Sequence, residues 1–197
     1  HNGLGLASYL SKAGMKILVV EDKDKVGGGL RTEELIPGYR VNPHAISMWA
    51  WPPIYRDFRL ADYGVKFVRP TVETAALFRD GRHIMLYQNQ PKLNFKNLSK
   101  YSEKDARTIS KIYHDYIKTF LKEYYSPPVH PSQRGGGLEA EKREEYQRIV
   151  SMPPRLAADE LFEDESIKLF FTLRILEIGT SDLHDGLGDF VIRMCAD

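Results

Sequence analysis

The apolar residues at the start of the chain follow a helical pattern that changes into a short, almost unbroken apolar run. Over residues 4–13 apolar side chains recur on one helical face, and Gly14 is a natural helix stop. Residues 16–20 form an apolar run that leads directly to Glu21. Such runs are typical of a parallel strand covered on both faces. The order of helix, glycine, strand and acid predicts the second half of a βαβ unit, whose first strand is expected upstream of residue 1.

Shorter elements are predicted in the next part of the chain. Residues 39–42 and 65–68 have the composition of strands. Between them, residues 52–63 are predicted to form a helix, because proline lies near its first turn and Gly64 follows its end. This part of the chain therefore continues an alternation of helix and strand.

A hairpin and a long helix are predicted next. Thr74–Phe78 and His83–Tyr87 flank an Asp-Gly pair, which is a strong hairpin signal. Ser102 and Asp105 have the spacing of a capping box, and the helix that it opens is expected to end near Tyr125. The apolar positions expected on one broad face of this helix are Ile109, Ile112, Tyr113, Tyr116, Ile117, Phe120 and Leu121.

The remainder of the chain is predicted to be helical. Residues 127–137 are rich in proline and glycine and form a predicted linker. Residues 138–150 are highly charged, which predicts a solvated helix. Two further helices are expected over 156–162 and 167–178, and a loop over 179–188.

Together these elements predict an α/β fold with two parts. Residues 1–66 are predicted to be an incomplete Rossmann-like domain, and residues 67–197 an incomplete α+β lobe of mixed strands and helices. With 197 residues and 42% hydrophobic content, the chain is long enough for one sizeable core and a smaller lobe.

Composition excludes several classes of function. The 28 basic residues are interspersed among 27 acidic ones, which argues against a nucleic-acid partner. Cys195 is the only cysteine, so an intrachain disulfide is excluded and a reducing, intracellular compartment is expected. The sequence has no apolar run of the roughly 18–20 residues that span a bilayer. The scattered histidines have no metal-ligand spacing, so no metal site is predicted.

The first residues resemble the end of a dinucleotide-binding motif. The full motif is Gly-x-Gly-x-x-Gly at a strand-to-helix turn, with an acid about 20 residues further on. His1-Asn2-Gly3 matches its last part, and Glu21 follows Gly3 by eighteen residues. Gly3 would allow close packing of the helix on a strand, and the N–H groups after it would face a diphosphate. Glu21 would accept hydrogen bonds from the ribose hydroxyls. A glycine at a helix start and an acid after a strand also occur in many unrelated α/β proteins.

Three consecutive glycines, Gly27–Gly29, follow the acid. They bury no side chain, so their expected value is close backbone approach to a ligand or turns with positive φ. A flexible surface loop is the alternative interpretation.

Residues 1 to about 66 resemble the FAD-dependent phytoene desaturase family of the flavin amine oxidase superfamily. The branch that they resemble most is the pyridine nucleotide-disulfide oxidoreductase-like, retinol saturase-like one. The matching motifs are His1-Asn2-Gly3-Leu4, Glu21-Asp22, Val26-Gly27-Gly28, Thr32-Glu33-Glu34, Pro37-Gly38-Tyr39-Arg40, Pro53-Ile54-Tyr55 and Leu60-x-x-Tyr63-Gly64-Val65.

The resemblance implies a bound FAD in residues 1–66 and a substrate-binding lobe in 67–197. It implies desaturation, saturation or isomerisation at a carbon–carbon bond of a largely apolar substrate, without identifying a catalytic residue. The residues that the resemblance and the motif assign to the cofactor are Asn2, Gly3, Leu4, Glu21, Asp22, Gly27, Gly28, Gly29, Arg31, Thr32 and His44.

The chain departs from this family at two places. Many relatives carry arginine directly after the double glycine, where this chain has Gly29. Arg31 either takes over that phosphate contact or is a surface residue. The family's Asp-x-Gly near the flavin ring is replaced by Asn42-Pro43-His44. His44 is either a proton donor beside the flavin or a structural histidine.

Two further features allow more than one interpretation. Trp49 and Trp51 either wall an apolar substrate channel or pack in a core. The helix from Ser102 to about Tyr125 either packs on the domain or makes a peripheral membrane contact through its Lys and Tyr residues.

The resemblance has a consequence for assembly. In this family a C-terminal segment closes the flavin site, and residues 150–197 do not resemble that segment. The chain is therefore expected to be a portion or subunit of a larger enzyme, whose remainder is another chain or a missing segment. The alternative is a non-catalytic, lipid-binding escort similar to the Rab GDP-dissociation inhibitors, which share the architecture.

Overall fold

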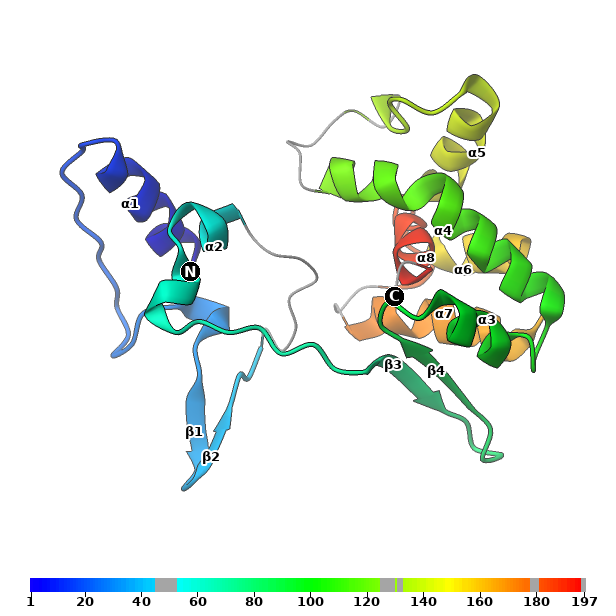
Figure 1. Ribbon diagram of the computed structural model, residues 1–197, viewed down its shortest axis with the longest axis horizontal. Helices are drawn as coiled ribbons and strands as arrows, with labels where there is room; N and C mark the ends of the chain where they lie inside the picture. Colours follow the sequence, from blue (N-terminus) through cyan, green and yellow to red (C-terminus); the bar gives the residue numbers. More distant parts are fainter. Residues whose placement is uncertain (45–52, 125–129, 131–132, 178–180, 196–197) are drawn as a thin grey trace. The chain divides into compact units, whose positions relative to one another are not determined.

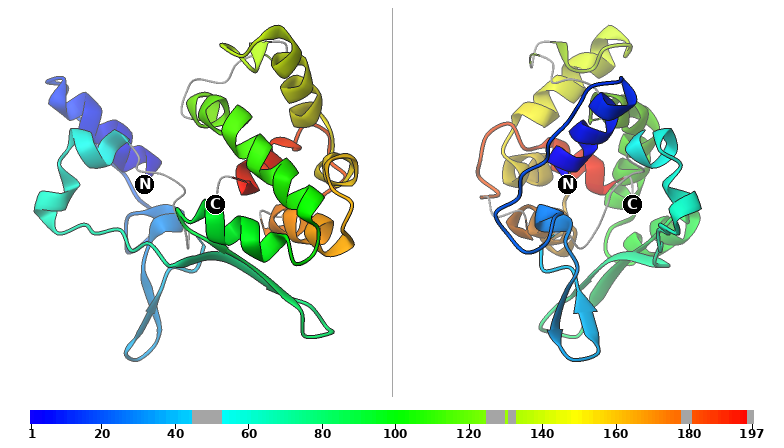
Figure 2. Two further views of the ribbon diagram at one scale, coloured as in Figure 1. Left: turned by 45° about the vertical axis from the view of Figure 1, so that its right-hand side comes forward. Right: turned by 90° about the vertical axis from the view of Figure 1, so that its left-hand side faces the viewer.

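The computed structural model describes residues 1–44, 53–124, 130, 133–177 and 181–195. It divides into two compact units, 1–67 and 68–197. The sequence placed the boundary between residues 66 and 67. Each unit is shown in Figures 1 and 2 and is described by itself.

The first unit contains short elements joined by long extended segments (Figure 1). In chain order they are helix α1 (Asn2–Lys12), the 3₁₀ turn η1 (Gly28–Leu30), strands β1 (Glu33–Ile36) and β2 (Tyr39–Val41), helix α2 (Pro53–Asp57) and the 3₁₀ turn η2 (Leu60–Tyr63). β1 and β2 pair antiparallel, with Glu33 opposite Val41. The helix predicted at the start of the chain and the strand predicted at 39–42 are both present.

The strand predicted at residues 16–20 is absent. This segment is extended, and Ile17 and Val19 line a groove with α1, whereas Leu18 and Val20 on the other side are 85% and 83% exposed. A strand forms only by hydrogen bonding to a neighbouring strand, and no described segment pairs with this one. The prediction was wrong for the same reason at residues 65–68, which are also extended and unpaired.

The helix predicted over residues 52–63 is divided in two. Arg59 adopts a left-handed conformation with φ of 49°, so α2 and η2 are separate. Gly64, also left-handed, caps η2 as predicted. The Tyr9 hydroxyl of α1 donates to Asp57 Oδ2 of α2 at 2.8 Å. This bond raises the pKa of Tyr9 and lowers the pKa of Asp57.

The second unit is a helical body with one hairpin (Figures 1 and 2). Its elements are strands β3 (Val72–Leu77) and β4 (His83–Tyr87), and helices α3 (Pro91–Leu98), α4 (Glu103–Tyr124), α5 (Ala140–Ser151), α6 (Pro154–Leu161), α7 (Glu165–Glu177) and α8 (Asp189–Met194). β3 and β4 pair antiparallel, with Leu77 opposite His83 across the Asp-Gly turn, as the sequence predicted. α8 is an element that the sequence pattern did not reveal.

The core of this unit is built around α4. Its described apolar residues that are buried are Ala106, Ile109, Ile112, Tyr116, Ile117 and Phe120. All of these except Ala106 belong to the predicted face, whereas Tyr113 and Leu121 lie at its exposed margin. α8 contacts α4, α5, α6 and α7, and its Val191 and Ile192 are fully buried. The short terminal helix therefore fills the centre of the body.

Helix α5 is not the solvated helix that its charge predicted. Tyr146, Ile149 and Val150 are each 1% exposed. They have the i, i+3, i+4 spacing of one helical face, so three apolar residues are enough to seat a charged helix on the core. The prediction gave too much weight to the charges on the opposite face.

The predicted capping box is formed in half. The backbone N–H of Asp105 donates to Ser102 Oγ at 3.1 Å, as expected for an N-cap. The Asp105 carboxylate does not complete the box. It instead accepts from the backbone N–H of Glu163 (2.9 and 3.1 Å) and of Asp164 (2.9 Å). Asp105 therefore joins the start of α4 to the segment before α7.

We expect Asp105→Asn to destabilise the second unit by about 2 kcal/mol, because an amide would turn a donor toward the backbone N–H groups of Glu163 and Asp164. Asp105 is fully buried, so water cannot replace the lost acceptor. Urea unfolding followed by circular dichroism measures the change. Glu103→Gln at the exposed start of the same helix is the matched control and should change stability by less than about 0.5 kcal/mol. Equal midpoints for the two variants would contradict the linking role of Asp105.

Across the described residues, no helix has both the length and the apolar character needed to cross a membrane.

Candidate functional site

Helix α1 begins with an open, uncapped N-terminus. Its first internal bond runs from Gly5 N–H to the His1 carbonyl at 2.9 Å, so the N–H groups of Asn2, Gly3 and Leu4 precede the helical ladder. No side chain caps this end, and its first turn contains no acidic residue. The partial positive charge of the helix start is therefore available to an anion.

The glycine loop lies against this helix start. The backbone nitrogen of His1 donates to the Gly27 carbonyl at 3.1 Å, and His1 Nδ1 lies 3.3 Å from the same oxygen. A Cβ on Gly28 would lie 3.8 Å from the His1 nitrogen. Two motifs that are 26 residues apart in the sequence are thus brought together.

The loop has a defined conformation that depends on glycine. Gly27 has φ of 122° and Gly28 has φ of 56°, in the region that side chains rarely adopt. Leu30 N–H donates to Gly27 O at 3.2 Å and Arg31 N–H to Gly28 O at 3.1 Å, which forms η1. The prediction of positive φ is confirmed at these two glycines.

His44 lies over the third glycine. A Cβ on Gly29 would lie 3.0 Å from His44 Nδ1, so a side chain there would require the imidazole to shift slightly. Next to it, the Thr32 hydroxyl donates to Asn42 Oδ1 at 2.9 Å. Residues of the Asn42-Pro43-His44 triplet and of the glycine loop are therefore neighbours.

Glu21 and Asp22 form the turn after the extended segment. Glu21 Oε1 accepts from the backbone N–H of Asp22 at 3.0 Å and of Lys23 at 3.1 Å. Lys23 also pairs with the Asp22 carboxylate at 3.0 Å. The bond from Lys23, with a smaller contribution from Glu21, lowers the pKa of Asp22. The turn holds the Glu21 carboxylate in a fixed position on the surface.

Arg31 contacts two carboxylates. Its guanidinium lies 3.7 Å from Asp24 Oδ1 and also pairs with Glu33. The side chain is 29% exposed. The arrangement matches neither of the two roles considered for Arg31, because the guanidinium is neither a free phosphate clamp nor an isolated surface group. A contact between Arg31 and a phosphate stays a prediction.

The described residues fit a dinucleotide diphosphate. The uncapped helix start, the positive-φ glycines and the open space around Gly3 form a cradle that side chains would fill. A Cβ on Gly3 would meet nothing within 4 Å. The close helix–strand packing predicted for Gly3 stays a prediction, since the neighbouring strand is not among the described segments.

Sequence reasoning missed the part that Asn42 takes in this site. Thr32 and Asn42 directly precede and follow the paired residues Glu33 and Val41. The hairpin register would therefore have placed them side by side. The approach of His44 to Gly29 had no such local signal, because no described ladder places residue 44.

A catalytic residue does not emerge from these elements. Among the described residues, no group of three or more His, Cys, Asp or Glu could hold a metal ion. Trp49 and Trp51, the candidate channel walls, lie outside the described residues.

Comparison with known proteins adds independent information. Residues 1–64 match the family model described as NAD(P)-binding Rossmann-like domain. The chain is 34% identical over 162 residues to a limonene dehydrogenase subunit from Castellaniella defragrans, a match that covers 78% of this chain and 29% of that protein. It is 32% identical over 130 residues to pyridine nucleotide-disulfide oxidoreductase domain-containing protein 2 of Rattus norvegicus, covering 61% of this chain and 22% of the relative.

These similarities support the coarse prediction of a dinucleotide-binding segment of an oxidoreductase with an α/β, Rossmann-like fold. The chain spans less than a third of the length of the curated relatives it matches. No solved structure matches the chain significantly.

Proposed function

We propose that this chain is a portion or subunit of a FAD-dependent oxidoreductase, and that residues 1–66 form part of its FAD site. The observation that carries the proposal is the contact between the start of α1 and the glycine loop, which joins the two halves of the motif at 3.1 Å. The N–H groups of Asn2, Gly3 and Leu4 would hold the diphosphate, with Gly27 and Gly28 beside it, and Glu21 would bind the ribose.

The order of the motifs favours FAD over NAD. The glycine pair follows the acid of the ribose site by only a few residues, which is the order found in the flavin family that the sequence resembles. The family model that matches is described in terms of NAD(P), so the identity of the dinucleotide belongs to this proposal. When bound, FAD supplies the acceptor or donor of a hydride, whereas the protein supplies position and electrostatics.

The proposed substrate is a largely apolar molecule that reacts at a carbon–carbon bond, by desaturation, saturation or isomerisation. One relative is named as a limonene dehydrogenase subunit, and limonene is a hydrocarbon. That name also supports assembly with another chain. We propose that residues 67–197 contribute to the substrate lobe.

A second candidate is a non-catalytic, lipid-binding escort on the same architecture. It is favoured by one observation, the closeness of the His44 imidazole to Gly29, the sequence position at which the resemblance leads us to expect arginine. Such an escort would use the fold without a flavin. The colour of the native assembly separates the two candidates.

We predict that the native assembly carries FAD and that the isolated chain binds FAD at least about 100-fold more weakly. Among the described residues of 1–67 none is buried, so the isolated unit has little core to hold a cradle in shape. The chain would be tagged and purified from its natural host, and the visible spectrum recorded. Released nucleotide would then be identified by chromatography against FAD and NAD standards.

The same purification of the chain produced alone is the control. A colourless native assembly that releases no FAD would reject the proposal in favour of the escort. Equal FAD content in the isolated chain would contradict the need for a remainder. Anaerobic bleaching of the flavin by an apolar candidate such as limonene would then test catalysis.

A further inference from the structure

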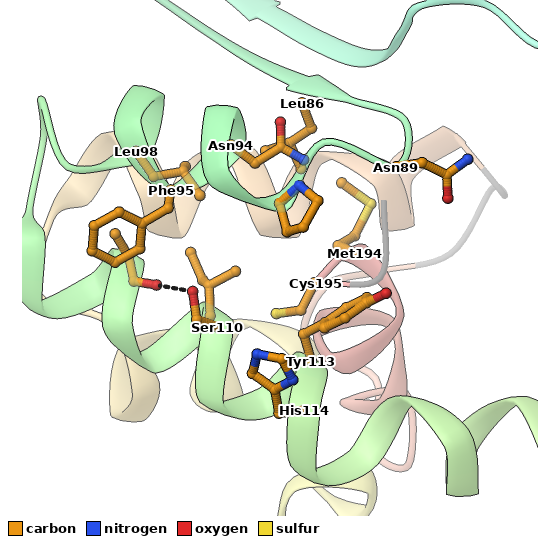
Figure 3. A pocket seen from close by; sticks show the side chains of 13 residues that line it. Leu86, Asn89, Asn94, Phe95, Leu98, Ser110, Tyr113, His114, Met194 and Cys195 are labelled. Atoms are coloured by element: carbon orange, nitrogen blue, oxygen red, sulfur yellow. Dashed lines mark hydrogen bonds between the residues drawn. The ribbon is translucent and has the colours of Figure 1, made fainter.

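The second unit contains a small pocket between its hairpin end and three helices (Figure 3). The pocket has a volume of about 60 Å³. Its walls come from the end of β4 and the turn after it, from α3, from the middle of α4 and from the end of α8. Cavities larger than a water molecule are few in a packed protein, so this one is a candidate binding site.

The pocket changes from apolar to polar between its interior and its mouth. The interior is walled by Leu86, Leu98 and Met194, each at most 2% exposed. The mouth carries the exposed side chains of Tyr113 and His114. Their rings meet edge to face with centroids 5.6 Å apart, and Figure 3 shows them on the Cys195 side of the pocket, across from Phe95.

Polar side chains in the interior are already hydrogen-bonded to the backbone. Asn94 Oδ1 accepts from Tyr87 N–H at 2.7 Å, and its Nδ2 donates to Tyr87 O at 2.9 Å. Ser110 Oγ donates to Ala106 O at 3.0 Å. Cys195 Sγ donates to Val191 O at 3.2 Å. A buried water needs two to four polar partners, and this interior offers them poorly, so an apolar group gains by entering it.

We propose that this pocket binds the end of a slender apolar molecule that carries one hydroxyl or carbonyl group. The apolar chain lies among Leu86, Leu98 and Met194, and its polar group meets Tyr113 and His114 at the mouth. All of the residues that line this pocket belong to the second unit, and the proposed binding does not require a bound flavin. A negative result therefore leaves the proposed FAD function unaffected.

Cys195 provides the test, because it lines the pocket and is the only cysteine of the chain. The full chain would react with methyl methanethiosulfonate in the presence of 1-alkanols from propanol to octanol. We expect saturating 1-hexanol to slow the modification at least tenfold. Apparent affinity should rise by about fourfold for each added methylene and level off once the pocket is full. Unfolding by the alcohol would instead speed up the modification, since it would expose the thiol.

Ser110 supplies a matched pair of variants, because it lines the pocket beside Ala106. Ser110→Leu fills the interior and should abolish protection by 1-hexanol, whereas Ser110→Ala leaves the pocket open and should preserve it. Unfolding midpoints establish that both variants are folded. Equal protection in a folded Ser110→Leu variant, or no protection by any alcohol in the unmodified chain, would overturn the proposal.

The mouth supplies a second test that does not disturb the core. The double variant Tyr113→Phe/His114→Leu changes two exposed side chains. It should lower the apparent affinity for 1-hexanol by about fivefold, because the proposed hydrogen bond to the hydroxyl group at the mouth is lost. The rise in apparent affinity for each added methylene of the alkanol should be unchanged. If affinity for 1-hexanol is unaltered in this double variant, the polar group does not sit at the mouth, and the proposed binding mode is wrong even where Ser110→Leu fails to fold.

Discussion

Gly188→Ala is expected to destabilise the second unit by about 4 kcal/mol, which is near the upper end of what single substitutions do. A Cβ on Gly188 would lie 2.0 Å from the carbonyl oxygen of Ile149 and 3.0 Å from that of Met152. Both obstacles are backbone atoms at the end of α5, so no side-chain rotation relieves the clash. Gly188 has φ of −63°, an ordinary value, and the cost therefore comes from packing and not from backbone strain.

The clash matters because α8 starts at the next residue. Gly188 N–H donates to Met152 O at 2.8 Å, and moving the glycine away breaks that bond. Val191, Ile192 and Met194 follow in the centre of the core, each at most 1% exposed. A shift at the start of α8 would move all three together. Since a change of 1 kcal/mol moves the melting temperature by roughly 2–4 °C in a protein of this size, we expect a fall of at least about 8 °C.

The matched control is Gly136→Ala. Gly136 has no positive φ, and its nearest atom, Gln133 O, would lie 3.7 Å from the new Cβ. We expect this variant to stay within about 0.5 kcal/mol of the unmodified chain. Thermal unfolding of the full chain, followed by far-ultraviolet circular dichroism, compares the two. A melting temperature for Gly188→Ala equal to that of the control would show that α8 can move without loss of packing.

Features fixed by nearby residues could be predicted from the sequence. The hairpin of β3 and β4 follows from the Asp80-Gly81 pair, because the turn itself sets the register. The buried face of α4 follows from apolar spacing, and five of its seven predicted residues are buried. In both places the information lies within one or two turns of the residue concerned.

Features that depend on distant partners could not be predicted in the same way. The apolar run at 16–20 has the composition of a strand, but strand formation needs a neighbour that the described chain does not supply. Asp105 has the spacing of a capping box, but its carboxylate is taken by Glu163 and Asp164, more than fifty residues away. In each case the local pattern is correct and a non-local contact decides the outcome.

The candidate site shows the same division. The glycines with positive φ were predictable, because few other residues tolerate that conformation. The packing of His44 on Gly29 was not, because it depends on how the chain returns after β2. The structure also shows a tight contact at Gly29, since a Cβ there would lie 3.0 Å from the imidazole.

Binding of the cofactor and ordering of the first unit are expected to be linked. No described residue of 1–67 is buried, and Leu18 and Val20 are more than 80% exposed. Apolar surface of this kind is covered in a stable domain. If the proposed remainder of the enzyme covers it, the candidate cradle is stabilised too, and any ligand that binds only the ordered form adds to stability by mass action.

Gly28→Val in the native assembly should lower the apparent affinity for FAD at least about 100-fold. The FAD content of the purified assembly should fall accordingly. The valine is β-branched and would be forced to φ of 56°, which costs roughly 1–3 kcal/mol. Its Cβ would also stand 3.8 Å from the His1 nitrogen, between the glycine loop and the helix start where we place the diphosphate. Backbone strain would change the shape of the cradle, and the valine side chain would block the diphosphate from entering it.

Gly38→Val is the control, because it separates the effect of backbone strain from the effect of a side chain at the proposed diphosphate site. Gly38 also has a positive φ, of 85°, and a Cβ there meets nothing within 4 Å. It lies at the tip of the β1–β2 hairpin, away from the glycine loop, so its variant carries comparable backbone strain without touching the cradle. We expect its FAD content to stay within about threefold of the unmodified assembly. If both variants lose FAD equally, general destabilisation of the first unit explains the loss, and Gly28 has no special place at the diphosphate.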